Sequence, residues 1–309
     1  YKFENDLANS TETAAKTNEG IREMWNGRQV MGNKNLRLGQ AKPYRGMEEL
    51  TSSNEITFME RPLATASGIY NNQFTTGAFL DGSGEGYGYG VSVYTPRSVS
   101  ESETQGLGVN ARGFIVPVRS NGNLVHIGLS ASQDNFETNT TSKDPRIVGR
   151  ENGLKTGALI AASTFNEQQT IAAELAARFG AFSMQGEYAK ATFEDNRASV
   201  VNVADNDLET YYVQASYFVT EHTKPYDFKK GVFKSPKLNG EEGAVELKAR
   251  YDVIENKDVS GNEASAYTLG VNYYATPNTR FMVEYVKGET DVGTDKDAAA
   301  ITARAQFNF

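Results

Sequence analysis

The stretch GAVELKARYDV, residues 243 to 253, decides the fold class because it alternates along its whole length. In an extended chain, side chains two residues apart lie on the same face of the strand. One face carries the apolar residues Val245, Leu247, Ala249, Tyr251 and Val253. The other face carries Ala244 and the charged residues Glu246, Lys248, Arg250 and Asp252. This pattern predicts a β-strand with one apolar and one charged face.

Two other stretches repeat the pattern. In ITARAQFNF (301–309) the apolar face holds Ile301, Ala303, Ala305, Phe307 and Phe309. AFSMQGEYAKATF (181–193) alternates as far as Lys190, which lies near a strand end where a lysine can reach lipid head groups. A soluble sandwich alternates too, but its apolar face is a core rich in Leu, Ile and Val. Here Ala, Gly, Tyr and Phe are frequent and aromatic residues lie near strand ends, which favours an all-β fold, a transmembrane antiparallel β-barrel.

The composition limits the other classes. The chain of 309 residues has no cysteine, so neither a disulfide framework nor a thiolate metal site can form. The net charge of −8 argues against a general nucleic-acid binder. No apolar run approaches the roughly 20 residues that a membrane helix needs. If the protein is exported, we expect its signal peptide to have been removed before Tyr1.

Fourteen strands are readable in the sequence. We place them at residues 1–8, 21–30, 35–42, 72–80, 86–95, 106–116, 123–131, 169–178, 181–193, 209–220, 243–254, 265–275, 279–288 and 299–309. Bacterial barrels have short periplasmic turns and longer outer loops. The connecting segments follow this rule except 221–241, which is long where a short turn is expected, and 142–163 could hold two further strands. Phe309 then ends the last strand on the periplasmic side and resembles the terminal assembly signal of outer-membrane barrels.

The first long outer loop, 43–71, contains EELTSSNEITFMERPL (48–63), which does not alternate. In channel barrels a long early loop folds into the lumen, where its backbone finds partners without a strand ladder and its side chains meet solute. We therefore predict a single barrel domain over 1–309 with 43–71 as its pore-constricting loop. The charged residues in and beside this loop are Lys42, Arg45, Glu48, Glu49, Glu55, Glu60 and Arg61. Their balance does not favour phosphate.

The charged faces of the strands predict a mildly basic pore wall. The predicted wall cations are Lys2, Arg22, Arg28, Arg37, Arg112, Arg178, Lys248, Arg250, Arg280 and Arg304. The predicted wall acids are Glu4, Asp6, Glu174, Glu187, Glu246, Asp252 and Glu284. Charges close to a pore set its ion preference, so we expect a weak anion or mixed preference. The alternative for each arginine is a structural ion pair, such as Arg250 with Glu246 or Asp252.

A resemblance adds to this interpretation. LRLGQAKPYRGMEELTSSNEITFMERPL (36–63) resembles the pore loop of the phosphate-selective porin O and P family, whose usual sequence runs close to L-R-x-G-Q-F-K, E-E-L-T-S-S and I-T-F-M-E-R. The likeness continues in the family's order through VHIGLSAS (125–132), ELAARFGAFSMQGEYAKA (174–191), YYVQASYFVTEHTKPYD (211–227), GVFKSPK (231–237), GAVELKARYDVI (243–254), LGVNYYATPNTRFMVEYVK (269–287) and ARAQFNF (303–309).

The resemblance implies a trimeric, 16-stranded porin of the bacterial outer membrane. Family chains usually carry about two more strands before the one that resembles YKFENDL, so this chain either starts late, which we favour, or uses 142–163 to complete its barrel. The phosphate-selective members depend on a Lys and Arg cluster in the constriction. Part of that cluster lies on the upstream strands, and that part cannot be assigned to residues of this sequence.

The predicted function is passive diffusion of small hydrophilic solutes, anionic or neutral, with phosphate as one candidate. The expected partners are outer-membrane lipid, lipopolysaccharide and two further copies of the chain, and no nucleic acid. The alternative is a structural barrel with a blocked pore that anchors a surface layer or envelope component. A barrel enzyme would need a Ser, His and acid on the outer rim, and the sequence fixes no such set around His126 or His222. No cofactor or metal is expected, because GSGEGYGYG (82–90) lacks the phosphate-loop spacing and the acidic loops lack the spacing of a calcium site.

Overall fold

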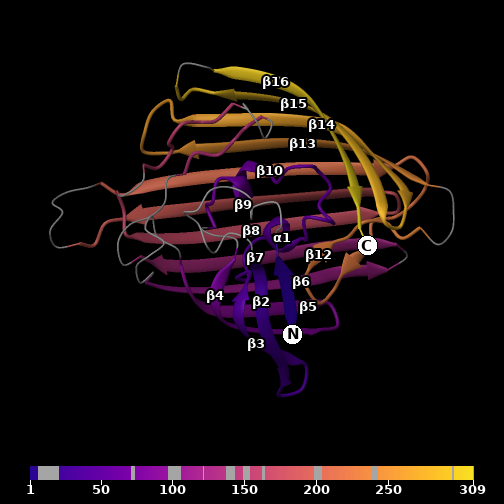
Figure 1. The fold of residues 1–309 in the computed structure, drawn as a ribbon, viewed down its shortest axis with the longest axis horizontal. Helices are drawn as coiled ribbons and strands as arrows, with labels where there is room; N and C mark the ends of the chain where they lie inside the picture. The colour runs from indigo at the N-terminus through magenta and orange to yellow at the C-terminus, as the bar shows by residue number, and fades with distance from the viewer. Residues whose placement is uncertain are drawn as a thin grey trace.

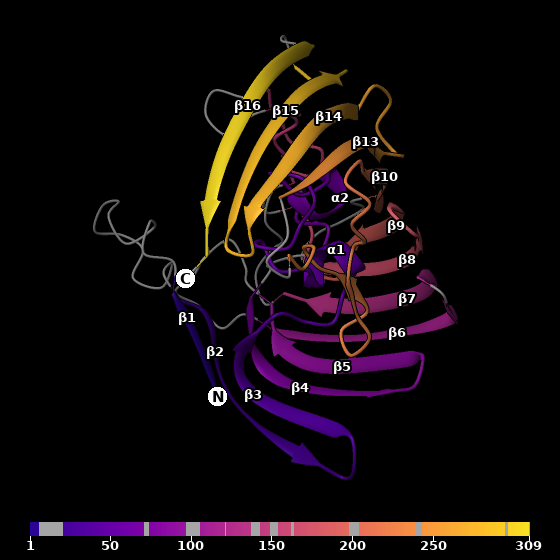
Figure 2. The same cartoon turned by 90° about the vertical axis from the view of Figure 1, so that its right-hand side faces the viewer.

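A computed structural model of the chain describes residues 1–5, 21–70, 74–96, 106–120, 122–136, 143–148, 154–161, 164–197, 204–238, 243–293 and 296–308. Fourteen strands form one continuous antiparallel sheet, in which each strand pairs with the next along the chain. The sheet curves strongly, and its two edges over these residues are β1 and β16 (Figure 1, Figure 2). Two short helices lie on its concave side (Figure 2).

The fourteen predicted strands correspond one to one with the strands of this sheet, which confirms the fold class. They are β1 Lys2–Asn5, β2 Ile21–Val30, β3 Lys34–Ala41, β4 Thr75–Gly84, β5 Tyr87–Thr95, β6 Leu107–Ser120, β7 Asn123–Asn135, β8 Glu167–Phe179, β9 Phe182–Glu194, β10 Asn206–Phe218, β13 Ala244–Asn256, β14 Glu263–Thr276, β15 Thr279–Thr290 and β16 Asp297–Phe307. The numbers β11 and β12 belong to a separate small hairpin, Tyr226–Asp227 and Val232–Phe233. The helices are α1 Met47–Leu50 and α2 Leu63–Ala66.

Strand ends differ from the prediction at several places. The clearest case is β6, which we expected to end at 116 and which runs to Ser120. Its pairing with β7 shifts register between Ile115 and Val118, so Pro117 sits at an irregularity where its missing N–H costs no ladder hydrogen bond. The strand therefore continues past the proline.

The two faces of the sheet have opposite chemistry. On β13, Glu246 is fully buried and Lys248 is 5 % exposed, whereas Leu247 and Tyr251 are 45 % and 47 % exposed. The polar face is the concave one, and the apolar face is the convex one that remains open. A soluble sheet protein would do the reverse. An apolar convex face with exposed tyrosines suits contact with lipid.

Helices contribute little to this architecture. In the part of the chain that the structure describes, none is long and apolar enough to cross a membrane. Both α1 and α2 have four residues and belong to segment 43–71.

The segment between β7 and β8 does not add strands to the wall, so the hypothesis of two extra strands in 142–163 is wrong for its described residues. β7 pairs directly with β8 from Asn123↔Phe179 to Asn135↔Glu167. Residues 143–148 and 154–161 form only two isolated bridges, Lys143↔Ile160 and Arg146↔Lys155. The number of 16 strands stays a prediction, and these residues do not add a pair to the fourteen strands.

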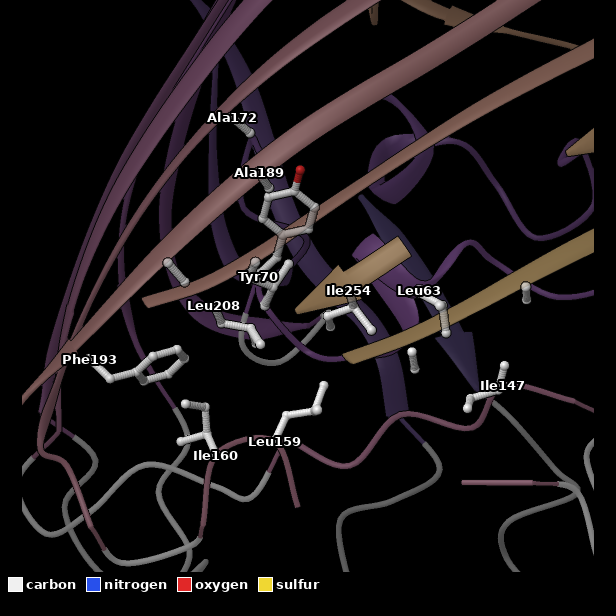
Figure 3. Packing of buried hydrophobic residues seen from close by; sticks show 14 of the residues in the cluster. Leu63, Tyr70, Ile147, Leu159, Ile160, Ala172, Ala189, Phe193, Leu208 and Ile254 are labelled. Carbon is white, nitrogen blue, oxygen red and sulfur yellow. The ribbon is translucent and has the colours of Figure 1, made fainter. Parts of the chain in front are cut away.

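The same segment instead packs inside the sheet. Ile147, Val148, Leu159 and Ile160 form an apolar cluster with Leu63, Ile69 and Tyr70 and with small or apolar wall residues from β8 to β14 (Figure 3). The wall residues in this cluster include Ala172, Ala189, Ala191, Phe193, Leu208, Ile254, Ala264 and Ala266. Burying each large aliphatic side chain contributes roughly 1.5–3 kcal/mol. This core joins segment 143–161 to segment 43–71 and covers one side of the lumen.

Candidate pore and its lining residues

Segment 43–71 has no strand ladder over its described residues. Its turns and helices pair part of its backbone, and charged wall residues supply further partners. Wall cations donate to its carbonyl oxygens: Arg280 to Ile56 at 2.8 Å, Lys248 to Thr57 at 3.0 Å and Arg250 to Glu60 at 2.9 Å. Wall acids accept from its amides: Glu187 from Glu48 at 2.7 Å, Glu284 from Met59 at 2.8 Å and Asp252 from Leu63 at 3.1 Å. Unpaired backbone groups inside a protein are costly, so both signs of wall charge hold this segment in place.

The same wall charges neutralise one another. Arg112 makes a bidentate contact with Glu174, at 2.7 and 3.1 Å. Arg250 donates to Asp252 at 2.7 Å, and Lys248 contacts Glu284. All six side chains are buried. The structural ion pair that we gave as the alternative for Arg250 is therefore present, with Asp252 as the partner.

Two predicted loop residues are also buried in contacts. Arg45 is 2 % exposed, and its guanidinium lies 3.3 Å from the carboxylate of Asp134 and contacts the hydroxyl of Tyr94. The carboxylate of Glu48 accepts from Gln185 at 2.9 Å. Neither residue lines either of the two lumen cavities near the sheet edges.

The long turn 221–241 enters the concave side from the opposite end. Its hairpin β11–β12 presents two carbonyls to Arg112, which donates to Lys230 O at 2.7 Å and to Gly231 O at 3.0 Å. Gly231 has φ +67°, and a Cβ there would lie 2.8 Å from the ring of Phe114. Only glycine fits this turn without strain.

The hairpin also supports segment 43–71. Lys224 pairs with Glu246 at 2.6 Å and donates to the Thr57 hydroxyl at 2.7 Å. The Ser235 amide donates to the carboxylate of Glu55 at 2.5 Å. The hairpin thus contacts both the wall and the loop. Turn 221–241 is longer than we expected because it forms a second segment that folds into the lumen.

Two cavities remain on the side of the lumen near the sheet edges. One of about 580 Å³ lies between β1, β2, β16 and the loop, and the other, of about 560 Å³, lies between the loop and β13 to β16. The first is lined by six cations and four acids: Lys2, Arg22, Lys42, Arg61, Lys230, Arg304, Glu4, Glu23, Glu49 and Glu60. The second is lined by Arg61, Arg146, Arg250, Arg304, Glu60, Asp252 and Glu284 among its charged residues. Both cavities have more cations than acids.

The cations of the first cavity differ in their partners. Lys2 lies 2.7 Å from Glu4 and also pairs with Glu23, and Arg304 lies 3.2 Å from Glu60. Arg61 donates to the carbonyls of Glu48 and Thr51, and Lys42 donates to the carbonyl of Glu49. A carbonyl holds a cation without cancelling its charge. Burial lowers the pKa of Lys42, which follows the end of β3, to about 8.

The remaining predicted residues lie elsewhere. Arg37 contacts Tyr44 and Asp81 and stacks near Trp25, and Arg178 donates to the carbonyls of Gly122 and Lys224. Arg280 is buried against Tyr274 and bonds Gln306. Phe309 lies outside the described residues, so the assembly signal stays a prediction.

Arg28 does not face the lumen as we predicted. A Cβ at its neighbour Gly27 would meet Trp25 and Arg37 on the concave side, so Arg28 points to the convex side. It pairs with Leu36 and is exposed, as are Met24 and Leu38 on the same face. The strand β2 carries polar residues on both faces, so its sequence alone did not fix which face was inside.

Three charged cavity residues, Glu23, Arg146 and Lys230, were not among those that we predicted. Lys230 is the one for which the sequence held a signal. It lies in the turn whose length broke the loop rule. That length, together with the basic residues Lys224, Lys229 and Lys230 within the turn, was the available signal.

Comparison with known proteins agrees with the resemblance in the sequence. The family model described as phosphate-selective porin O and P matches residues 1–309. The chain belongs to this family. A curated relative, Porin O of Pseudomonas aeruginosa, is 27 % identical over 315 aligned residues, which cover 89 % of this chain and 70 % of the relative. The protein is therefore an outer-membrane porin.

Solved structures share the porin's fold at low identity. An anion-selective porin from Comamonas acidovorans matches with a TM-score of 0.53 and 12 % identity, over 88 % of this chain and 70 % of that one. The trimer form of in-vitro folded OmpT, an outer membrane protein of Vibrio cholerae, matches with a TM-score of 0.50 and 12 % identity, over 92 % of this chain and 78 % of that one. These matches support the transmembrane barrel architecture.

Proposed function

We propose that this porin is a passive diffusion channel for small hydrophilic solutes with a weak preference for anions, and with phosphate among the candidate solutes. The observation that carries the proposal is the first cavity, with its six cations and four acids. Three of the cations, Lys42, Arg61 and Lys230, have no carboxylate within ion-pair distance among the described residues. A small surplus of positive charge beside the path favours anions modestly.

The proposal includes the geometry of the channel. One barrel domain spans residues 1–309, segment 43–71 constricts the pore, and the hairpin β11–β12 narrows it from the other end. The docking of segment 43–71 through wall charges and of the hairpin through Arg112 supports this arrangement. The solvent-exposed charged residues of the two cavities then act on the solute. The buried pairs, which include Arg250 and Asp252 beside the second cavity, hold the constriction.

The assembly is a homotrimer in the outer membrane. Family membership and the likeness to a trimer form of OmpT support this number of copies. Outer-membrane lipid and lipopolysaccharide cover the convex face, where Tyr251, Tyr267, Tyr273 and Tyr285 are exposed. The channel performs no bond-making step. Family membership supports this, because the matching family model describes a porin.

Planar-bilayer recording of the folded protein tests the proposal. In a KCl gradient we expect discrete conductance steps in groups of three, a mild anion preference in the reversal potential, and no block by phosphate at low concentration. Strong cation selectivity would contradict the proposal. Phosphate block at low concentration would show a dedicated site. No conductance would favour a structural barrel that anchors a surface layer or envelope component.

A further inference from the structure

The two cavities meet at a small set of residues. Met59, Glu60, Arg61, Ala66 and Arg304 line both of them. Three of these five are charged, and they come from two elements, the loop and the edge strand β16. The two cavities therefore adjoin where the loop meets β16.

The position of Glu60 at this junction is fixed by its backbone. Its carbonyl accepts from Arg250 at 2.9 Å, and the preceding amide, of Met59, donates to Glu284 at 2.8 Å. From this anchored position the carboxylate reaches across to Arg304 at 3.2 Å. The ion pair therefore spans the gap between a fixed point of the loop and the wall.

This pair remains in contact with solvent. The side chains of Arg304 and Glu60 are 30 % and 53 % exposed, whereas those of Arg250 and Asp252 in the neighbouring buried pair are 7 % and 2 % exposed. An ion in either cavity is thus close to both charged groups.

The junction carries one negative and two positive side chains. Arg61 directs two of its donors to the carbonyls of Glu48 and Thr51 and pairs with no carboxylate in the described part of the chain. Arg304 is opposed by Glu60. Among these three described side chains the surplus is one positive charge, and neutralising Glu60 would raise it to two.

We infer that the Glu60–Arg304 pair is the element of this channel that sets the balance between anions and cations, with Glu60 lowering and Arg304 raising the anion preference. This inference rests on the proposed function, because it assigns the selectivity of that channel to particular residues. Its mechanism is electrostatic: each head group acts on the passing ion directly.

Single-channel reversal potentials of two variants test the inference. Glu60→Gln removes the negative charge and should raise the anion-to-cation permeability ratio roughly three- to tenfold, as expected for one unit charge several ångströms from a hydrated ion. Arg304→Gln should lower the ratio by a similar factor. Both variants break the same ion pair. If the pair served only to brace the loop, the permeability ratio would shift in the same direction in both variants.

Two controls complete the test. Arg304→Lys keeps the charge and should leave the ratio unchanged, and the double variant Glu60→Gln/Arg304→Gln should return close to wild type. If wild type shows mild anion preference but the two single variants fail to move in opposite directions, the inference is overturned and the proposed function stands. If wild type is strongly cation-selective or does not conduct, the proposed function itself fails.

Discussion

Arg250 on β13 and Arg304 on β16 both point from late strands toward Glu60, yet their surroundings differ. Arg250 is buried between the carboxylate of Asp252, the Glu60 carbonyl and the ring of Phe58, which lies 4.6 Å from its guanidinium. Arg304 has a partly exposed carboxylate as partner and lines both cavities. The first arginine fixes the loop, and the second one acts on the solution in the pore.

The two sides of the lumen differ in the same way. From β6 to β15, which we call the docked side, the wall cations pair with carboxylates or donate to the backbone of the in-folded segments. Little of their charge therefore reaches the solute path. Near the edges, on β1, β2 and β16, which we call the open side, the cations Lys2, Arg22 and Arg304 line the first cavity. A charge acts on a passing ion when it is solvated and only partly compensated. The number of arginines on a wall therefore says less about selectivity than their partners do.

The largest expected effect comes from breaking a buried pair on the docked side. Lys248→Met leaves Glu284 buried without its cation and removes a donor to the Thr57 carbonyl. Loss of one member of such a pair typically costs about 3–5 kcal/mol. We expect a fall of that size in the free energy of unfolding, measured by urea titration in detergent with gel mobility as the readout.

The matched control for this variant is Lys287→Met. Lys287 lies on the convex face and pairs with Glu289 at 2.8 Å in an exposed position. Removing it should leave the unfolding curve unchanged, because exposed ion pairs contribute little. If both variants lost the same free energy of unfolding, the buried pairs would not be what holds the docked side together.

A smaller effect is expected from removing a charge on the open side. Arg61→Gln takes away a cation that lines both cavities and should lower the anion-to-cation permeability ratio by roughly threefold. Arg61→Lys disturbs the same carbonyl contacts while keeping the charge, so it should retain the wild-type reversal potential. If the permeability ratio fell by a similar factor in both variants, the effect would come from the loop geometry and not from the charge.

A pH change should produce a still smaller shift through Lys42. Burial lowers the pKa of this lysine to about 8, so its ammonium form dominates at pH 7 and is lost as the pH rises above that value. The first cavity then loses one positive charge. We expect the anion preference to fall between pH 7 and 9.5, as measured by reversal potential, and we expect Lys42→Arg to abolish this fall because arginine stays charged. A pH response that persists in Lys42→Arg would point to another group.

The sequence predicted most of the sheet well because a strand with one face toward lipid and one toward the lumen alternates along its length. The alternation in 243–253 gave the strand, its facing and its charged lumen side, and all three agree with the structure. The existence of an in-folded segment also follows from sequence, because 48–63 cannot alternate. These features depend on local periodicity, which the chain records directly.

The partner of each charge was not predictable in the same way. Arg250 with Asp252 is separated by two residues on one strand, so that pair could be proposed in advance. Arg304 with Glu60 joins residues 244 positions apart, and only the docking of the loop brings them together. Lys230 reaches the cavity because a turn folds inward, a choice that depends on Arg112 and on the glycine at 231.

The smallest expected effect concerns Arg28, which the structure places on the convex face opposite the neighbouring Gly27. Arg28→Gln should leave the reversal potential unchanged, because the wall separates this charge from the path and salt screens exposed charges beyond about 10 Å at 0.1 M. Side chains alternate with a period of two, so a slip of β2 by one residue would carry Arg28 to the lumen. A shift in selectivity as large as that of Arg304→Gln would therefore mean that β2 is registered one residue away from its pairing with Leu36. Arg28 would then have to be counted with the lumen cations of the open side.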